Sequence, residues 1–205
     1  MATDQKTIDI LKQRASVKEY DTTHEMTKEE LTELLDITTK APSAWNLQHW
    51  HFTVFHSAES KAKLLPIAYN QKQISQASAV IAVLGDLEAN QNGEKIYSEL
   101  AEQGFITEDI KETLMTQING AYQSEQYARE AAYSNASLAA MQLMIAAKAM
   151  GYDTCAMGGF SKEAFIKEFN VSGRYEPVML ISVGKAAKEA HKSNRFDIEE
   201  VSDFL

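Results

Sequence analysis

An almost wholly apolar run at residues 79–85 constrains the fold more than any other segment. It reads Ala-Val-Ile-Ala-Val-Leu-Gly, with no polar residue at alternate positions. A strand with one face in water alternates apolar and polar residues, whereas an unbroken apolar strand is covered on both faces. The run therefore predicts a central strand that lies between two layers of helices.

Three further segments have the alternation or the apolar content of strands. They are residues 51–56, 152–157 and 178–183, and Pro177 lies at the start of the last, where a missing backbone N–H is tolerated. The chain begins with helices, and its strands do not alternate strictly with them. We therefore predict an α+β fold: a three-layer sandwich with a mixed or antiparallel central sheet flanked by helices, in a single domain over residues 1–205.

Helix start and stop signals frame the other segments. Thr3 can cap a short first helix. Thr27 and Glu30 have the spacing of a capping box, and Pro42 stops the helix that this box opens. Residues 89–123 are polar, charged and helical in character. We predict that they form a helical insertion or lid.

A long helix is predicted over residues 124–150, with Gly151 as its C-terminal cap. Within residues 138–150 only Gln142 and Lys148 are polar. A helix that is apolar nearly all round must be covered on nearly all sides, and this one is too short to cross a membrane. In a chain of this size we expect part of the cover to come from a second subunit.

Composition excludes several classes of partner. Lys and Arg number 20 against 29 Asp and Glu, which gives a formal net charge of −9. Nucleic-acid and membrane-surface binding both need extended basic patches, so neither partner is expected. Cys155 is the only cysteine, which fits a reducing compartment. The first residues lack the apolar run of a signal peptide, and we expect a cytoplasmic protein.

Arg14, Ser16 and Lys18 alternate near the N-terminus. If this piece is extended, the three side chains share one face. A guanidinium fork and a hydroxyl suit phosphate oxygens, and the lysine can reach a second group on the same ligand. The alternative is a helix end with two solvated cations.

The decapeptide at residues 41–50 combines a proline, a hydroxyl, amides and two tryptophans. Ser43, Asn46 and Gln48 could recognise a ring edge that presents both donors and acceptors, or they could simply satisfy a loop. Trp45 is more often a core anchor than a ligand stacker. A connecting loop needs turn-forming residues, not this combination of polar and aromatic side chains.

Two later segments are weaker candidates. Adjacent glycines at Gly158 and Gly159 let a backbone approach a flat ligand, although a tight turn explains them equally well. Lys192 and Arg195 follow the last predicted strand and could be solvated surface. If the tail folds back, Arg195 can complete a phosphate site with Arg14.

Other chemistries lack a necessary part. His49 and His51 could ligate a metal, but no third ligand stands at a useful spacing, and we predict no metal site. No G-x-S-x-G elbow marks a serine hydrolase. No G-x-G-x-x-G follows a strand, and no phosphate-binding loop of the G-K-[ST] kind exists.

These motifs, in this order, resemble those of the FMN-dependent nitroreductase family. Residues 14–18 (Arg-Ala-Ser-Val-Lys) resemble its R-x-S-x-[RK] motif, and residues 41–50 resemble its A-P-S-x-x-N-x-Q-P-W signature. Asn70 lies where the family keeps a ring-binding asparagine, and Met157-Gly158-Gly159-Phe160 resembles its glycine turn at the flavin edge. The resemblance covers nearly the whole chain.

The resemblance implies an intertwined homodimer with an FMN in each of two interfacial sites. Residues of one subunit would hold the cofactor's phosphate, ribityl chain and ring edge, and the 42–46 loop would come from the other subunit. The implied FMN-binding residues are Arg14, Ala15, Ser16, Lys18, Pro42, Ser43, Ala44, Asn46, Asn70, Gln73, Gly158, Gly159, Lys192 and Arg195.

The implied activity is a ping-pong transfer of reducing equivalents from NADH or NADPH through FMN to nitroaromatic, quinone or similar conjugated acceptors. No side-chain acid or base is implied. A flavin-binding storage or sensing module without turnover is the alternative. Three positions depart from the family: His49 replaces a proline, Gln73 replaces a frequent lysine, and Gly158 stands where some relatives carry glutamate.

Overall fold

The computed structural model describes residues 5–205, so Thr3 lies outside the described residues. Four strands form one sheet: β1 (Trp50–Phe55), β2 (Ala79–Asp86), β3 (Asp153–Met157) and β4 (Tyr175–Gly184). The helices are α1 (Gln5–Gln13), α2 (Lys28–Thr38), α3 (Ala58–Ile67), α4 (Lys72–Gln76), α5 (Asn90–Glu102), α6 (Glu108–Ala121), α7 (Glu125–Ala149) and α8 (Lys162–Glu168). Two short 3-10 turns, η1 (Ala44–Asn46) and η2 (Ile198–Glu200), complete the described elements.

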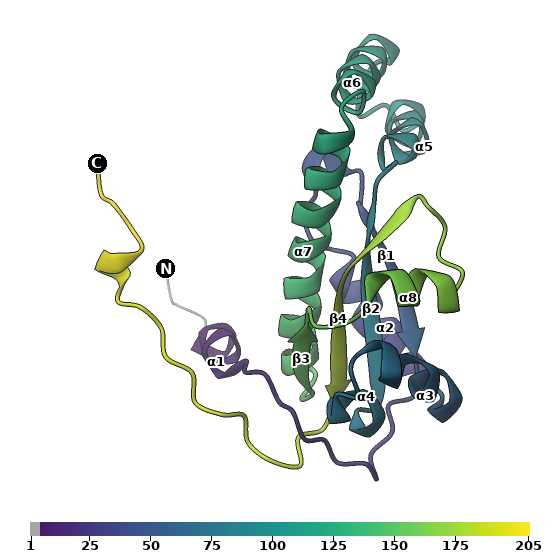
Figure 1. The fold of residues 1–205 in the computed structure, drawn as a ribbon. Coiled ribbons are helices and arrows are strands. Elements are labelled where there is room, and N and C mark those ends of the chain that lie inside the picture. Colours follow the sequence, from purple (N-terminus) through teal and green to yellow (C-terminus); the bar gives the residue numbers. More distant parts are fainter. Residues whose placement is uncertain (1–4) are drawn as a thin grey trace.

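The sheet has the order β1-β2-β4-β3, and all of its neighbours pair antiparallel. Every residue of β2 is buried, as the apolar run predicts. Successive β2 side chains enter different cores: Ile81 and Val83 pack with α2 and α7, whereas Val80 and Leu84 pack on the side of α3 and α8. The predicted α+β sandwich is confirmed, with an antiparallel sheet between two helical layers (Figure 1).

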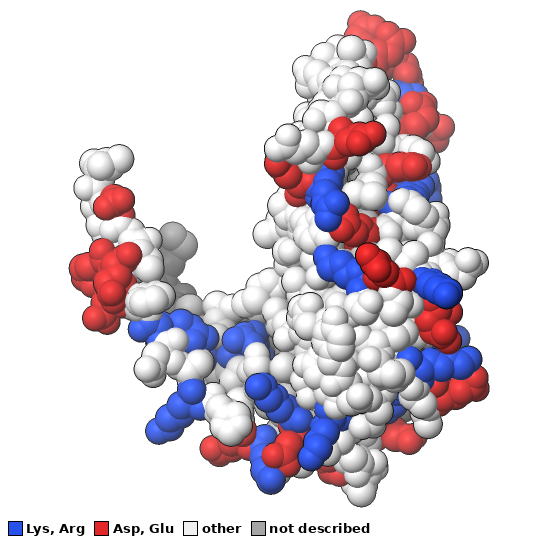
Figure 2. All heavy atoms as spheres, in the orientation of Figure 1, with Lys and Arg blue, Asp and Glu red and all other residues white. Residues whose placement is uncertain are grey.

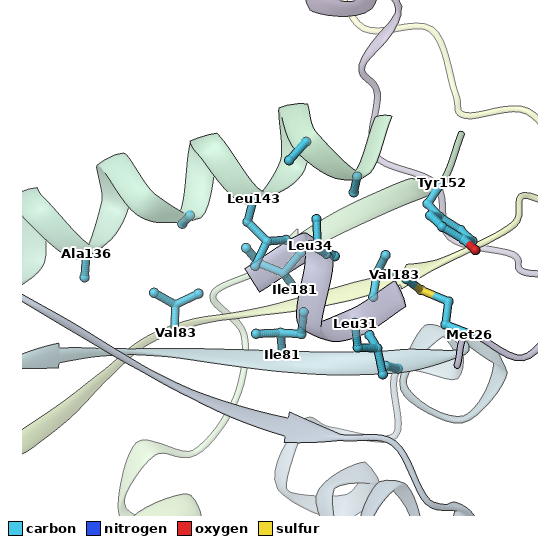
Figure 3. Close-up of a cluster of buried hydrophobic side chains, with 14 residues drawn as sticks. Met26, Leu31, Leu34, Ile81, Val83, Ala136, Leu143, Tyr152, Ile181 and Val183 are labelled. Atoms are coloured by element: carbon cyan, nitrogen blue, oxygen red, sulfur yellow. The ribbon is translucent and has the colours of Figure 1, made fainter. Parts of the chain in front are cut away.

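Helix α7 lies along one face of the sheet. Figure 3 shows Leu143 of α7 above Ile81 of β2 and Ile181 of β4, with Leu34 of α2 beside them. The helix approaches closely because its buried stripe is mostly alanine: Ala128, Ala131, Ala132, Ala136, Ala139, Ala140, Ala146 and Ala147. Its outer face carries Leu138 and Met141, which are 47% and 41% exposed.

Local signals fix several element ends. The capping box at Thr27 is present, with the Thr27 hydroxyl accepting from the Glu30 N–H and the Glu30 carboxylate accepting from the Thr27 N–H. Helix α2 nevertheless ends at Thr38, before Pro42 can stop it. Gly151 has a φ of +80° and ends α7 in the left-handed conformation expected of a C-terminal cap.

Pro177 does not stand at the start of a strand, contrary to the prediction. It is the third residue of β4, and it faces Leu84 at a register shift where Val83 pairs with Met179. A β-bulge interrupts the ladder at this point, so the missing proline donor is tolerated inside the strand.

Three parts project from the sandwich in Figure 1: the α5–α6 hairpin at one end, and α1 and the tail after β4 at the side. Residues 89–123 are largely helical, as the sequence predicts; their role as a lid stays a prediction. The tail leaves Phe196, Val201 and Phe204 exposed. Among residues 5–205, no helix has both the length and the hydropathy needed to cross a membrane.

Candidate functional site

The Arg14–Lys18 segment is extended and lies against β3. Ser16 forms a parallel bridge with Thr154, and the Val17 N–H donates to the Thr154 carbonyl at 3.0 Å. Val17 is buried, whereas Ser16 and Lys18 are exposed. This alternation places Ser16 and Lys18 on one face. Arg14 is half-buried at the end of α1, where its N–H donates to the Ile10 carbonyl at 3.0 Å.

The same three side chains influence the pKa of the buried Cys155 thiol. Burial raises the pKa of Cys155, while the charge of Lys18, a hydrogen bond with Ser16 and the charge of Arg14 act in the opposite direction. All three therefore lie close to one point on β3. Figure 2 shows Lys and Arg side chains gathered where α1 and the tail join the body, and acidic side chains prominent at the α5–α6 end.

A second group forms where α4 meets the turn after β3. The Gln71 side chain donates to the Gly159 carbonyl at 2.8 Å, and the Gln73 side chain donates to Gln71 Oε1 at 3.1 Å. Asn70 precedes them with a φ of +56° and an exposed side chain. The structure thus joins Gln73 to Gly159 through Gln71, with Asn70 next to Gln71 in the chain, and Gln73 is only 7% exposed.

The backbone at Gly158 is open. A Cβ added there would meet no heavy atom within 4 Å, and one added at Gly159 would meet only Gln71 Nε2, at 3.9 Å. Both glycines are exposed, between the buried Met157 and Phe160. A flat ligand can therefore reach the peptide groups of this turn without displacing a side chain.

The 42–46 loop lies elsewhere in the protomer. The Ala44 N–H donates to Asn135 Oδ1 at 2.8 Å, which ties the loop to the first half of α7. The Arg14–Lys18 segment instead lies by the other end of α7, where Lys148 pairs with Asp153 at 2.8 Å. The rise of a helix separates Asn135 from Lys148 by about 20 Å.

The two cations of the tail lie in an exposed segment. Lys192 and Arg195 are both exposed. Within the described residues, Arg195 hydrogen-bonds only inside its own segment, from Nη1 to Ser193 Oγ and to the Asn194 carbonyl, both at 2.8 Å. A phosphate site shared by Arg195 and Arg14, which the sequence allows if the tail folds back, stays a prediction.

The two histidines of the loop have different environments. His49 is fully buried and stacks on Tyr122, and burial lowers its pKa to about 4. His51 is exposed and stacks on Tyr175. Across residues 5–205, no three His, Cys, Asp or Glu side chains are arranged to hold a metal.

A hollow of about 590 Å³ lies beside the 43–48 loop, away from the Arg14–Lys18 segment and the glycine turn. Its lining comes from β1, β2, α5, β4 and the residues just before β1 and β4, and includes Gln48, Asp86, Lys95 and Arg174. It contains none of the predicted FMN-binding residues. Most of the predicted residues are exposed or half-buried in the protomer, whereas Gln73 is buried.

Sequence reasoning missed the side chains that support these groups. Gln71 links α4 to the glycine turn, and Asn135 links α7 to the 42–46 loop. Asn135 is 6% exposed. An amide in an otherwise alanine-rich buried stripe is the signal that could have identified it, because a buried polar group needs a specific partner.

Comparisons with known proteins identify the family to which this sequence and fold are similar. The model of the nitroreductase family matches residues 11–185. The chain is 72% identical to YodC of Bacillus subtilis, assigned as an NAD(P)H nitroreductase, over 97% of this chain and 98% of YodC. It is 32% identical to the CLA biosynthesis enone reductase of Lactiplantibacillus plantarum, over 96% of this chain and 93% of that protein.

A solved structure agrees in fold along the whole chain. It is a protein of Exiguobacterium sibiricum, assigned as a nitroreductase and crystallised in complex with FMN. Its TM-score is 0.91 at 38% identity, covering 100% of this chain and 99% of that one. The family resemblance drawn from the order of the motifs is confirmed. This chain belongs to the nitroreductase family.

Proposed function

We propose that the chain is an FMN-dependent oxidoreductase that acts as a homodimer and uses NADH or NADPH to reduce conjugated acceptors. The observation that carries the proposal is the row formed by Arg14, Ser16 and Lys18. It lies beside β3, and the same strand leads into the open glycine turn at Gly158 and Gly159. The cationic row suits the phosphate end of FMN, and the open backbone of the glycine turn suits its ring end.

The residues fit the phosphate end of the cofactor. Half-buried Arg14 supplies a guanidinium fork and exposed Ser16 a hydroxyl, both near Cys155, with Ala15 between them in the chain. The net charge of −9 makes such local cations necessary to hold a dianion. Lys192 and Arg195 would add to this end if the exposed tail moves onto a subunit surface.

The residues also fit the ring end. Asn70 is exposed and provides an amide with donors and acceptors for a ring edge. Gln73 is only 7% exposed and donates to Gln71, so in the protomer it supports Gln71, which in turn holds the Gly159 carbonyl in place. Gly158 leaves its peptide accessible. Lys18 is the cation nearest this edge in our proposal.

A second copy of the chain would complete the site. Pro42, Ser43, Ala44 and Asn46 lie about 20 Å along α7 from the Arg14–Lys18 segment, so one protomer does not present both groups together. The apolar outer face of α7 supports the same arrangement, because Leu138 and Met141 would be covered in a dimer.

When bound, FMN supplies the redox chemistry by accepting and releasing electron pairs. The protein positions the ring and provides electrostatic stabilisation. In our proposal, Lys18 stabilises the negative charge that develops on the ring edge during reduction. No side-chain acid or base is assigned, because water can supply protons at an open face.

Two relatives indicate the class of acceptor. YodC is assigned as an NAD(P)H nitroreductase, and the Lactiplantibacillus relative is named an enone reductase. Nitroaromatics, quinones and enones share a conjugated, electron-poor π system. We propose that acceptor and nicotinamide use the same open face in turn, which gives ping-pong kinetics.

An absorption spectrum of the purified protein, followed by anaerobic titration with NADH and NADPH, tests the proposal. We expect a yellow protein that is bleached by a nicotinamide and recoloured by menadione or a nitroaromatic. A yellow protein that neither nicotinamide bleaches would instead support a storage or sensing module. A colourless protein that does not take up added FMN would contradict the proposal.

A further inference from the structure

We propose that Tyr97 and Asn135 are positioning residues that hold the 43–48 loop in the conformation needed to bind flavin. Neither side chain can itself contact the ligand, because they are 7% and 6% exposed. The inference rests on the proposed function, since it concerns the same FMN site. Part of the flavin affinity would then depend on Tyr97 of α5 and on Asn135 on the buried face of α7.

The loop has an unfavourable backbone conformation. Trp45, Asn46 and Gln48 have φ angles of +50°, +53° and +53°. Side chains with a Cβ rarely adopt this left-handed region, and tryptophan and glutamine have no special tolerance for it. Three such residues within four positions persist only when the surrounding structure holds them there.

Helix α5 holds the loop from one side. The Tyr97 hydroxyl donates to the Trp45 carbonyl at 2.8 Å, and the Asn92 side-chain amide donates to the Leu47 carbonyl at 2.9 Å. Both acceptors are backbone carbonyls beside the left-handed residues. Their positions therefore depend on where α5 lies.

The orientation of Asn92 is itself determined by an ion pair between half-buried Arg174 and buried Asp86. Arg174 donates to both carboxylate oxygens of Asp86, from Nε at 2.7 Å and from Nη2 at 2.6 Å. Arg174 Nη2 also donates to Asn92 Oδ1 at 2.8 Å. The Asn92 oxygen is thereby occupied, so its amide nitrogen must face the Leu47 carbonyl.

Helix α7 holds the loop from the other side. Asn135 Oδ1 accepts from the Ala44 N–H at 2.8 Å, and its Nδ2 donates to the Ala131 carbonyl at 2.7 Å. Within the loop, the Gln48 N–H donates to Ser43 Oγ at 3.0 Å. Of the proposed ligand contacts, Ser43 is therefore next to the Ala44 N–H that α7 holds, and Asn46 lies between the two carbonyls that α5 holds.

Removing one of these contacts without disturbing the fold tests the inference. Tyr97→Phe deletes the hydroxyl alone, and Tyr152→Phe is its matched control. Tyr152 is also buried, at 4% exposed, and its hydroxyl donates to Glu30 at 2.5 Å, far from the 43–48 loop. Both variants lose one hydrogen bond and should have similar melting temperatures as apoproteins.

The readout is the FMN dissociation constant, measured by quenching of free-flavin fluorescence. We expect Tyr97→Phe to raise this constant about fivefold, the effect of one lost hydrogen bond, and Tyr152→Phe to leave it unchanged. Asn135→Ala should raise it by at least as much. If Asn135→Ala does not fold, Tyr97→Phe alone decides the matter.

A double-mutant cycle tests whether Tyr97 acts through the loop. In an Asn46→Ala background the contact that Tyr97 positions is already lost, so Tyr97→Phe should change the constant by less than about twofold. Additive losses would overturn the inference, and so would an unchanged constant in the Tyr97→Phe single variant. Wild-type protein that binds no FMN would contradict the proposed function and this inference together, whereas flavin-loaded wild type with unaffected variants would contradict this inference alone.

Discussion

Gly85 of β2 lies against the backbone of Ala132 in α7. A Cβ added at Gly85 would come within 2.9 Å of the Ala132 carbonyl oxygen and 3.0 Å of its Cβ. The first of these contacts is with backbone, which cannot rotate away. The pair therefore sets how closely α7 can approach the central strand.

We expect Gly85→Ala to destabilise the protein by about 1 to 3 kcal/mol, because the added methyl group overpacks the interface between helix and sheet. Thermal or urea unfolding measures the change. Gly120→Ala is the matched control, because Gly120 lies in α6 and an added Cβ there meets no atom within 4 Å. The control should be stabilised by about 0.5 to 1 kcal/mol through helix propensity. Equal stability of the two variants would contradict the close contact.

His49 makes stability depend on pH. Neither of its ring nitrogens has a hydrogen-bond partner among the described residues, and burial lowers its pKa from 6.5 to about 4, partly opposed by the charge of Asp86. The unfolded state therefore binds more protons between these values, and stability rises with pH across that interval. The contribution is complete above about pH 6.5 and is lost as pH falls towards 4, about 3 kcal/mol in all.

Replacing His49 should remove this dependence. We expect the stability of His49→Leu, followed by urea unfolding from pH 7 to pH 4.5, to fall less steeply than that of wild type. His51→Gln changes an exposed histidine two residues away and should keep the wild-type slope. Parallel curves for wild type and His49→Leu would show that folding does not lower the pKa of His49.

Elements with strong local signals could be predicted from the sequence. The unbroken apolar character of β2 required cover on both faces, and two separate cores provide it. The helix predicted over residues 124–150 is α7, and Gly151 follows its end as the predicted C-terminal cap. In each case the residues that give the signal lie within, or at the end of, the element that they predict.

Features set by distant contacts could not be predicted. The position of Pro177 inside β4 depends on a bulge opposite Leu84, which no local pattern specifies. The support that Asn135 gives to Ala44 joins residues 91 positions apart. The motifs indicated which residues belong to the candidate site, but they gave no sign of the contacts that position its loop.

Lys18 can be tested separately from flavin binding. We expect Lys18→Ala to retain bound FMN and to be reduced by NADH or NADPH about 10²-fold more slowly, because a cation beside the ring edge stabilises developing negative charge. Anaerobic stopped-flow absorbance measures this rate. Lys40→Ala is the control, since Lys40 forms an exposed ion pair with Asp36 on α2. An unchanged rate in Lys18→Ala would remove the proposed role.

Substitutions on the outer face of α7 test whether the protein forms a dimer. Leu138 is 47% exposed in the protomer, and Ile110 of α6 has the same exposure. If a second copy covers α7, a carboxylate at position 138 would be buried without a partner, which is costly, whereas one at position 110 would stay in water. We therefore expect Leu138→Glu to sediment as a monomer and to lose FMN, and Ile110→Glu to remain dimeric and yellow. The loss of FMN should follow the loss of the dimer, because Ser43 and Asn46 then no longer reach the flavin site of the other subunit. A monomeric Leu138→Glu that binds FMN as tightly as wild type would show that one chain completes the site alone.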